Sequence, residues 1–175
     1  LLIAVSQSGE SSDILTAANT ALRRGIDVLA LTNMEDSALV KMAHYTLLTR
    51  AGQEMAVTAT KSYVAQLAAL FLISLELAER RKTSDDLTSL RRKLFEASRL
   101  IKEVIESSND MMLHLAEKYG DRNFFFTLGS GPNYATALEA ALKLKEACNV
   151  FAEGFAAREF LHGPIQLIND RTPAI

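Results

Sequence analysis

A loop rich in serine near the start of the chain holds the first residues that could do chemistry. After an apolar run from Leu1 to Val5 come Ser6, Gln7, Ser8, Gly9, Glu10 and Ser11. Hydroxyls, the Gln7 amide and backbone N–H groups can all donate hydrogen bonds to an anion, and the positive end of a following helix would add to the attraction. The same spacing fits Ser8 or Ser11 acting only as a helix cap. The residues alone leave both interpretations open.

This loop does not carry the motifs of the common nucleotide-binding sites. It lacks the G-x-x-x-x-G-K-[ST] pattern of a P-loop, and its single glycine, Gly9, does not make a dinucleotide fingerprint. One glycine does allow the backbone to come close to a ligand. If the loop binds an anion, we therefore expect a phosphate held by hydroxyl and N–H groups, without a lysine or arginine.

A second group of ionisable residues lies in the last quarter of the chain. Glu139, Lys143 and Glu146 follow one another at four- and three-residue spacing, which places them on one face of a helix. Leu138, Ala141 and Leu142 would then help to make the packing side. A solvent-exposed ladder of ion pairs is the common meaning of such a face. His162, just before Gly163 and Pro164, is by itself most simply a turn residue.

Alternating strand and helix patterns must position these residues. We expect buried strands at residues 1–5, 27–32, 45–49 and 123–128. We expect helices at residues 11–24, from a cap at Asp36 or Ser37 to Met42, from Thr58 or Thr60 to residues 80–82, at residues 84–119, and from after Pro132 to about Asn149. Strands that alternate with helices predict the α/β class, with doubly wound parallel sheets and flanking helices.

The order of strand, Ser/Gly loop and helix occurs twice, which indicates a weak internal repeat. We expect a first domain at residues 1–82, a helical connector at residues 83–119 that could break near Ser107-Ser108-Asn109, and a second domain at residues 120–175. The chain starts without Met, and residues 171–175 look like the beginning of a strand. We therefore expect both halves to be incomplete and the chain to be part of a longer protein.

The composition fits a globular protein that binds something small. Of the 175 residues, 49% are apolar and 23% are charged, and the formal net charge of -2 comes from interspersed charges of both signs. No basic stripe indicates a nucleic-acid partner. The longest apolar stretch, residues 64–77, is interrupted by Gln66, Ser74 and Glu76 and falls short of a membrane span. We expect neither a nucleic acid nor a membrane as partner.

The cysteine and histidine residues add two expectations. The single cysteine, Cys148, cannot form an internal disulfide and lies in a helical segment, so we expect it in the packed interior and the protein in the reducing cytoplasm. His44 and His114 are expected to be surface or packing residues, and no metal-ligand spacing joins them to His162. We therefore expect no metal site.

Several motifs, in this order along the chain, resemble those of one protein family. The run Ser6–Ser11 between a strand and a helix resembles the phosphate loop of the sugar isomerase (SIS) family. The other matching segments resemble the isomerase domains of glucosamine-6-phosphate synthases and deaminases within that family: residues 51–54, 60–61, 137–146, 152–153 and 159–164. The resemblance implies two SIS-type, flavodoxin-like halves joined by a helical connector, and an enzyme that needs no cofactor.

The resemblance also implies a role for individual residues. Those that would hold the phosphate are Ser6, Gln7, Ser8 and Ser11, and those that would line the sugar site are Val57 and Ala59. Glu146 matches the base that transfers a proton, Lys143 a lysine near the sugar hydroxyls, and His162 the ring-opening histidine. Because the neighbouring subunit supplies that histidine in the synthases, the resemblance implies a homodimer with a shared active site.

The implied activity is aldose–ketose isomerisation of a 6-phosphosugar, fructose 6-phosphate or glucosamine 6-phosphate, by ring opening and enediol or enolamine proton transfer. Two alternatives stay open: an isomerase for another 6-phosphosugar, and a non-catalytic phosphosugar-binding regulator, which would need neither Glu146 nor His162. Three residues differ from the synthase pattern: Ser11 replaces threonine, Ala59 replaces serine and Arg158 replaces glycine. The second change removes one hydrogen-bond donor from the expected sugar site.

Overall fold

The computed structural model describes residues 1–82 and 86–175 and divides the chain into two compact units, Leu1–Lys102 and Glu103–Ile175. The strands are β1 (Leu2–Ser6), β2 (Val28–Thr32), β3 (Tyr45–Leu48), β4 (Phe124–Gly129) and β5 (Phe151–Ala156). The helices are α1 (Ser12–Arg23), α2 (Ala38–Met42), α3 (Lys61–Arg81), α4 (Leu87–Tyr119), α5 (Asn133–Cys148) and α6 (Ala157–Phe160), and a 3-10 helix spans Pro164–Leu167. The expected strands and helices are all found; the expected helix start at Ser84 lies outside the described residues.

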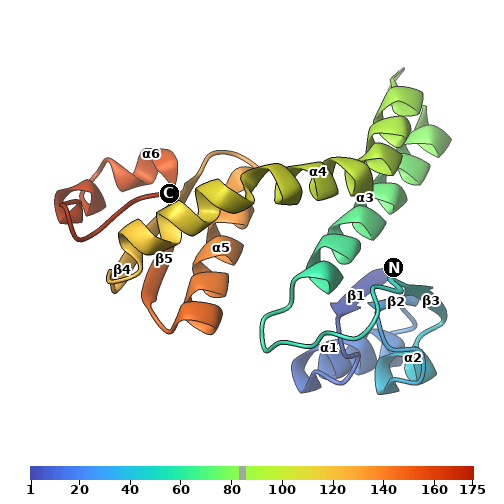
Figure 1. Ribbon diagram of the computed structural model, residues 1–175. Coiled ribbons are helices and arrows are strands. Elements are labelled where there is room, and N and C mark those ends of the chain that lie inside the picture. Colours follow the sequence, from blue (N-terminus) through green and yellow to red (C-terminus); the bar gives the residue numbers. More distant parts are fainter. Residues whose placement is uncertain (83–85) are drawn as a thin grey trace. The chain divides into compact units, whose positions relative to one another are not determined.

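In the first unit, β1, β2 and β3 form a parallel sheet in chain order. Small side chains let a helix approach this sheet closely: Ala4 and Ala30 pair across β1 and β2 and are buried together with Ala18 of α1 and Leu39 of α2. Figure 1 shows α1 and α2 against the sheet. Because the strands are parallel, their carboxyl ends meet at one edge, where ligands bind in open α/β sheets.

α3 follows the sheet as a helix of 21 residues that ends at Arg81, and the next residue, Lys82, caps it with a left-handed backbone (φ 52°). By length and composition it could cross a membrane, contrary to the expectation drawn from residues 64–77. This is weak evidence, because core helices of globular proteins can also be this long and this apolar.

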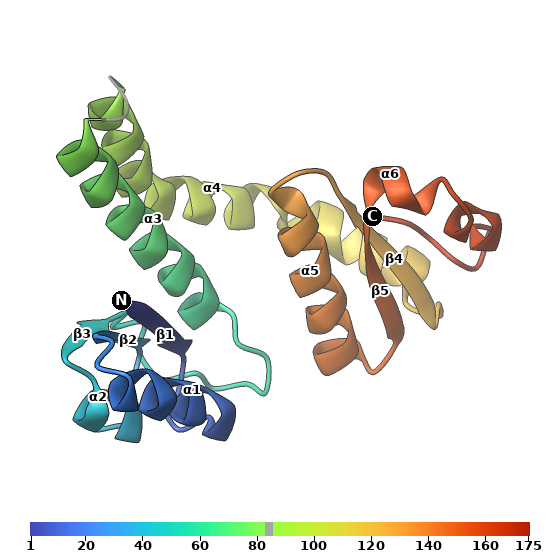
Figure 2. The same cartoon turned by 180° about the vertical axis from the view of Figure 1, so that it is seen from behind.

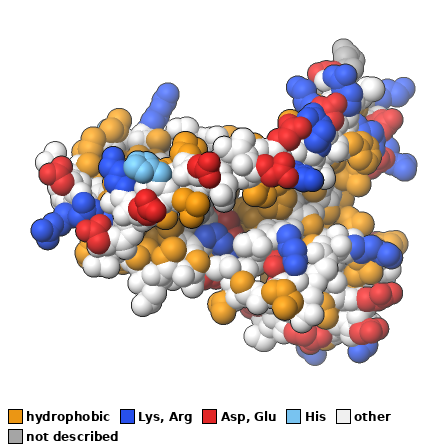
Figure 3. Space-filling model, viewed as in Figure 1, with side chains coloured by type: hydrophobic (Ala, Val, Ile, Leu, Met, Phe, Trp, Pro, Cys, Tyr) orange, Lys and Arg blue, Asp and Glu red, His pale blue; other side chains and the backbone are white. Residues whose placement is uncertain are grey.

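α4 is a single helix of 33 residues that contributes to both units. It runs through Ser107, Ser108 and Asn109 without interruption, so the expected break is wrong. Serine and asparagine are only mildly unfavourable inside a helix, and one such cluster does not end it. Figure 3 shows charged side chains of both signs interspersed over the end of α3 and the beginning of α4.

In the second unit, β4 and β5 are parallel and α5 packs on them (Figure 2). The approach is close: a Cβ added to Gly154 of β5 would lie 2.9 Å from Cα of Leu138. The side chains between helix and strands are therefore small, and Ala137 and Ala141 are buried. Leu138 and Leu142 are 45% and 42% exposed, so only Ala141 of the three predicted packing residues lies on the packing side.

The structure also corrects the expected burial of Cys148. This residue is the last of α5, as the helical pattern predicts, but it is exposed. It lies at the edge of a cavity of about 670 Å³ whose other lining residues include Leu115, Phe125, Leu144 and Ile175. Helical periodicity shows which residues share a face but not whether the last turn of a helix is covered.

The C-terminal residues form the beginning of a further strand, as expected. Phe126 of β4 donates its N–H to the carbonyl of Pro173 and accepts from the N–H of Ile175. Ala174 thus pairs with β4 in parallel. β5, α6 and the 3-10 helix were not predicted from the sequence. Together with the first sheet, these elements confirm the α/β class with parallel sheets and flanking helices.

Candidate functional site

The serine loop begins at the carboxyl end of β1 and is closed by its own side chains. Ser6 is 6% exposed; its hydroxyl accepts from the N–H of Gly9 (3.0 Å) and lies 3.1 Å from the hydroxyl of Ser11. Ser8 accepts from the N–H of Glu10 (3.2 Å). Ser11 occupies the N-cap position of α1, yet its side chain makes no capping hydrogen bond. The loop therefore brings the hydroxyls of Ser6 and Ser11 together, with a third hydroxyl on Ser8, at the start of a helix that lacks a side-chain cap.

Gly9 is required at its position by both conformation and space. Its φ is +66°, in the left-handed region, and an added Cβ would collide with the Ser37 side chain. The Gly9 carbonyl also accepts from the N–H of Leu39 in α2 (3.0 Å). Only glycine fits this conformation without strain. The serine loop is thus seated directly against the N-terminus of α2.

Two further contacts hold the same loop. One carboxylate oxygen of Glu10 accepts from the N–H of Ala38 (2.7 Å), so Glu10 serves the start of α2 rather than that of α1. The Gln7 carbonyl accepts from the N–H of Asn33 (3.1 Å) and the hydroxyl of Thr32 (3.2 Å). The loop after β1 is therefore fixed by residues at the end of β2 and the start of α2.

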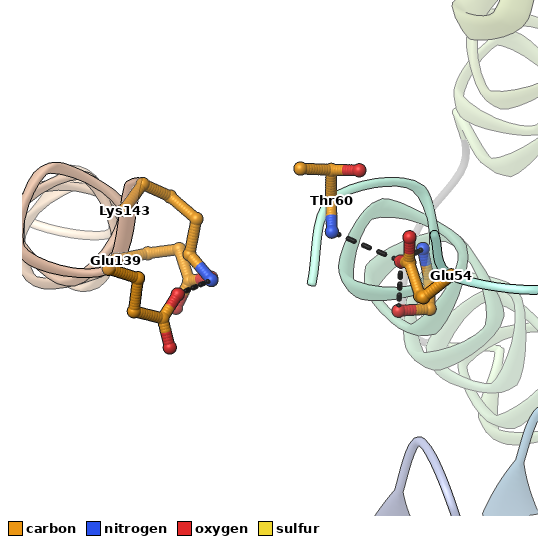
Figure 4. Close-up of polar contacts among 6 residues, drawn as sticks. Glu54, Thr60, Glu139 and Lys143 are labelled. Atoms are coloured by element: carbon orange, nitrogen blue, oxygen red, sulfur yellow. Dashed lines mark hydrogen bonds and ion pairs between the residues drawn. The ribbon is translucent and has the colours of Figure 1, made fainter. Parts of the chain in front are cut away.

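The expected sugar-lining residues lie between β3 and α3. Val57 is 91% exposed and Ala59 is half-buried. Near them, one carboxylate oxygen of Glu54 accepts from the Ser62 hydroxyl (2.6 Å), the Ser62 N–H (2.9 Å) and the Thr60 N–H (3.1 Å) (Figure 4). These three hydrogen bonds lower the pKa of Glu54, and the bond from the Ser62 hydroxyl has the largest effect. Glu54 thereby caps α3 and holds the end of this loop.

The second unit brings together the ionisable residues predicted on one helix face. In α5, Nζ of Lys143 lies 2.7 Å from Oε2 of Glu146 and 3.3 Å from Oε1 of Glu139 (Figure 4). All three side chains are about a quarter exposed, at 25%, 28% and 23%. Partial burial acts to lower the pKa of Lys143, but hydrogen bonds to both carboxylates outweigh it and raise the pKa. Lys143 thus bridges two carboxylates at a position where only about a quarter of each side chain is exposed to solvent.

His162 follows α6 in the second unit. Its N–H donates to the carbonyl of Glu159 (3.1 Å), and the residue is exposed. Within residues 103–175, no hydrogen bond or ion pair joins the His162 side chain to Glu146. The fold of one chain therefore assembles Lys143 with Glu146 and leaves His162 outside that group.

Comparison with known proteins gives the family. The SIS domain family matches residues 1–74. The resemblance of the serine loop to that family is thereby confirmed.

Relatives align along the whole chain. Glutamine–fructose-6-phosphate aminotransferases from Thermococcus kodakarensis and Mycolicibacterium smegmatis are 40% and 43% identical over 100% of the chain, which spans 29% and 28% of their length. The C-terminal domain of glucosamine-fructose-6-phosphate aminotransferase from Francisella tularensis has the same fold, with a TM-score of 0.93 and 28% identity over 98% of this chain and 49% of that domain. α3 therefore has its counterpart inside that domain.

Sequence reasoning missed several residues that shape the SIS site. Thr32 and Asn33 bond to the serine loop from outside it, and Glu54 holds the loop before α3. Ser37, by contrast, caps α2 as predicted. One signal could have found Glu54: an acidic residue shortly before a helix often caps its N-terminus. Asn33 offered a weaker signal, because asparagine directly after a buried strand commonly bonds to nearby backbone.

Proposed function

We propose that the protein is a sugar-phosphate isomerase of the glucosamine-6-phosphate synthase or deaminase type. Its substrates are fructose 6-phosphate and glucosamine 6-phosphate, and the chemistry is ring opening followed by proton transfer through an enediol or enolamine. The observation that carries the proposal is the serine loop, with three hydroxyls, two of them in contact, at the uncapped start of α1. The names of relatives at about 40% identity support the same substrate class.

Phosphate binding is assigned to Ser6, Gln7, Ser8 and Ser11. Hydroxyl and N–H donors at a helix N-terminus suit a phosphate group, whose oxygens accept hydrogen bonds from several directions. Because Ser11 does not cap α1, its hydroxyl can turn to a ligand at little cost to the helix. Val57 and Ala59 are assigned to the sugar part of the site.

Proton transfer is assigned to Glu146, with Lys143 beside it. The Glu146 carboxylate removes a proton from one of the two carbons, C1 or C2, and returns it to the other. The Lys143 ammonium, 2.7 Å from that carboxylate, can stabilise negative charge that develops on the neighbouring sugar oxygen. The raised pKa of Lys143 keeps its ammonium group cationic at neutral pH.

Ring opening is assigned to His162 of a second copy of the chain in a homodimer. The residue is exposed and has no bond to Glu146 within its own unit, which is compatible with service in a partner's site. A cytoplasmic location completes the proposal, since phosphosugars are intracellular metabolites.

The test is proton NMR of the full-length protein with fructose 6-phosphate, with and without ammonia, and separately with glucosamine 6-phosphate. Appearance of an aldose phosphate, an amino sugar or released ammonia supports the proposal and identifies the subclass. Glu146→Gln serves as the matched control for contaminating isomerase and must be inactive. Binding of either sugar phosphate without conversion would overturn the enzyme proposal in favour of a phosphosugar-binding regulator.

A further inference from the structure

Asn33 lies between the two loops that carry the proposed phosphate and sugar contacts. It is the first residue after β2, and its N–H donates to the carbonyl of Gln7 in the serine loop (3.1 Å). Thr32 donates its hydroxyl to the same carbonyl (3.2 Å). The backbone of Asn33 is therefore fixed to the serine loop.

The side chain of Asn33 bonds to a different segment, the residues that follow β3. Its Nδ2 donates to the carbonyl of Gly52 (2.7 Å), and its Oδ1 accepts from the N–H of Ala51 (2.8 Å) and the hydroxyl of Thr49 (3.0 Å). Both acceptor positions and one of the two amide hydrogens are used. Because the oxygen faces donors and the nitrogen faces a carbonyl, the orientation of the amide is defined.

The segment that Asn33 holds contains a strained residue. Arg50 lies between Thr49 and Ala51 and has a left-handed backbone, with φ of 50°. A non-glycine residue stays in that conformation only when its surroundings hold it there. The Asn33 Oδ1, which accepts from the residues on both sides of Arg50, supplies this restraint.

The sugar-lining loop itself has little packing of its own. Met55 and Val57 are 85% and 91% exposed, so core contacts do not fix their positions. The loop is anchored after Ala59 by the bonds from Thr60 and Ser62 to Glu54, and before Met55 by Asn33. Of these two anchors, Asn33 is the one that also bonds to the serine loop.

We propose that Asn33 is a positioning residue that sets the spacing between the phosphate-holding loop and the sugar-lining loop. It thereby matches the site to the distance between the phosphate and the hydroxyls of a 6-phosphosugar. This inference rests on the proposed function. It assigns Asn33 no contact with substrate and no part in proton transfer.

The test compares the affinities of Asn33→Ala and wild type for inorganic phosphate and for fructose 6-phosphate by calorimetry. The variant keeps the backbone bond to Gln7, so phosphate affinity should change by less than about threefold, whereas fructose 6-phosphate affinity should fall by about tenfold or more, as expected for loss of hydrogen bonds that order the sugar loop. Asn19→Ala, at an exposed position of α1, is the matched control and should bind both ligands like wild type.

A second variant keeps the test decisive if Asn33→Ala does not fold. Thr49→Val removes one of the three side-chain bonds and should change the ratio of the two affinities in the same direction by a smaller factor. Equal weakening of both ligands, or an unchanged ratio in folded variants, would overturn the positioning role while leaving the proposed function intact. Failure of the wild-type protein to bind either ligand would overturn both.

Discussion

Lys143 holds its ammonium group 2.7 Å from the carboxylate of Glu146 on the same face of α5. The pKa of Lys143 is raised above its ordinary value of 10.5, because its hydrogen bonds to Glu146 and Glu139 outweigh the opposite effect of burial. The ion pair is therefore intact throughout the neutral range. Glu146 therefore has the Lys143 ammonium group on one side and is partly exposed to solvent.

Replacing Lys143 with Met should alter stability in the alkaline range. A group whose pKa is raised on folding stabilises the fold fully below its unfolded pKa of 10.5 and loses that effect as the pH rises through the folded value. The difference in Tm between wild type and Lys143→Met should thus be larger at about pH 8 than at about pH 11.5. Lys145→Met, at an exposed position of the same helix, is the control; a similar pH response in both variants would contradict the prediction.

Glu146→Gln and Ser8→Ala should separate chemistry from binding. Glu146→Gln removes the proposed base while preserving shape, so kcat should fall by a factor of about 100 or more with sugar-phosphate affinity within about threefold of wild type. Ser8→Ala removes one phosphate donor, so binding should weaken by about five- to tenfold. Steady-state kinetics and calorimetry measure the two effects. Loss of binding in Glu146→Gln would contradict this division of labour.

Gly9→Ala should destabilise the first unit. The new Cβ would collide with the Ser37 side chain in a backbone conformation of positive φ, and we expect a loss of about 2–4 kcal/mol in the free energy of unfolding. Gly25→Ala is a matched control, because Gly25 has nearly the same φ (+69°) but no atom within 4 Å of an added Cβ. It should cost only the conformational part, about 1 kcal/mol. Urea unfolding of both variants measures the difference, which should vanish if the Ser37 contact is unimportant.

Glu54→Gln should be less stable than wild type at neutral pH, and this difference should become smaller in acid. The pKa of Glu54 is lowered from its ordinary value of 4.5, chiefly by the Ser62 hydroxyl. Its charged form therefore stabilises the fold above 4.5, and this effect is lost as the pH falls through the lowered pKa. The Tm difference should be present at about pH 7 and shrink as the pH falls below about 4.5. Glu35→Gln, at an exposed position, controls for surface charge; a difference that persists in acid would count against the cap.

Sequence patterns with a period of two to four residues predicted most strands and helices, and they also predicted which side chains of a helix lie next to one another. Apolar runs predicted β1 to β4 but not β5, and the spacing of Glu139, Lys143 and Glu146 placed these residues on one face, as the ion pairs confirm. Which side of α5 packs was not predictable from leucine spacing. It depends on Gly154 in a distant strand, whose lack of a side chain brings the helix so close that alanines fill the contact.

The network around the serine loop lay beyond sequence reasoning for a related reason. Asn33 bonds to residues on both sides of it in the chain, Gln7 and Gly52, and these partners become neighbours only when the parallel strands align. The same holds for Glu10, which directly precedes the N-cap residue of α1 in the chain but whose carboxylate accepts from the N–H of Ala38 in α2. Local spacing cannot report such contacts.

The hydrogen bond between Ser6 and Ser11 can run in either direction, since each hydroxyl can donate or accept. These two neutral hydroxyls can rotate to match the protonation state of a bound phosphate. They hold it through their dipoles rather than through a fixed charge. Because residues 6–11 include no cation, affinity for inorganic phosphate should decline little between about 0.05 and about 0.5 M salt, where a lysine-based site would weaken markedly. A steep decline would mean that a cation from elsewhere completes the site. A loop built in this way would remain selective for phosphate in a cell whose ionic strength changes.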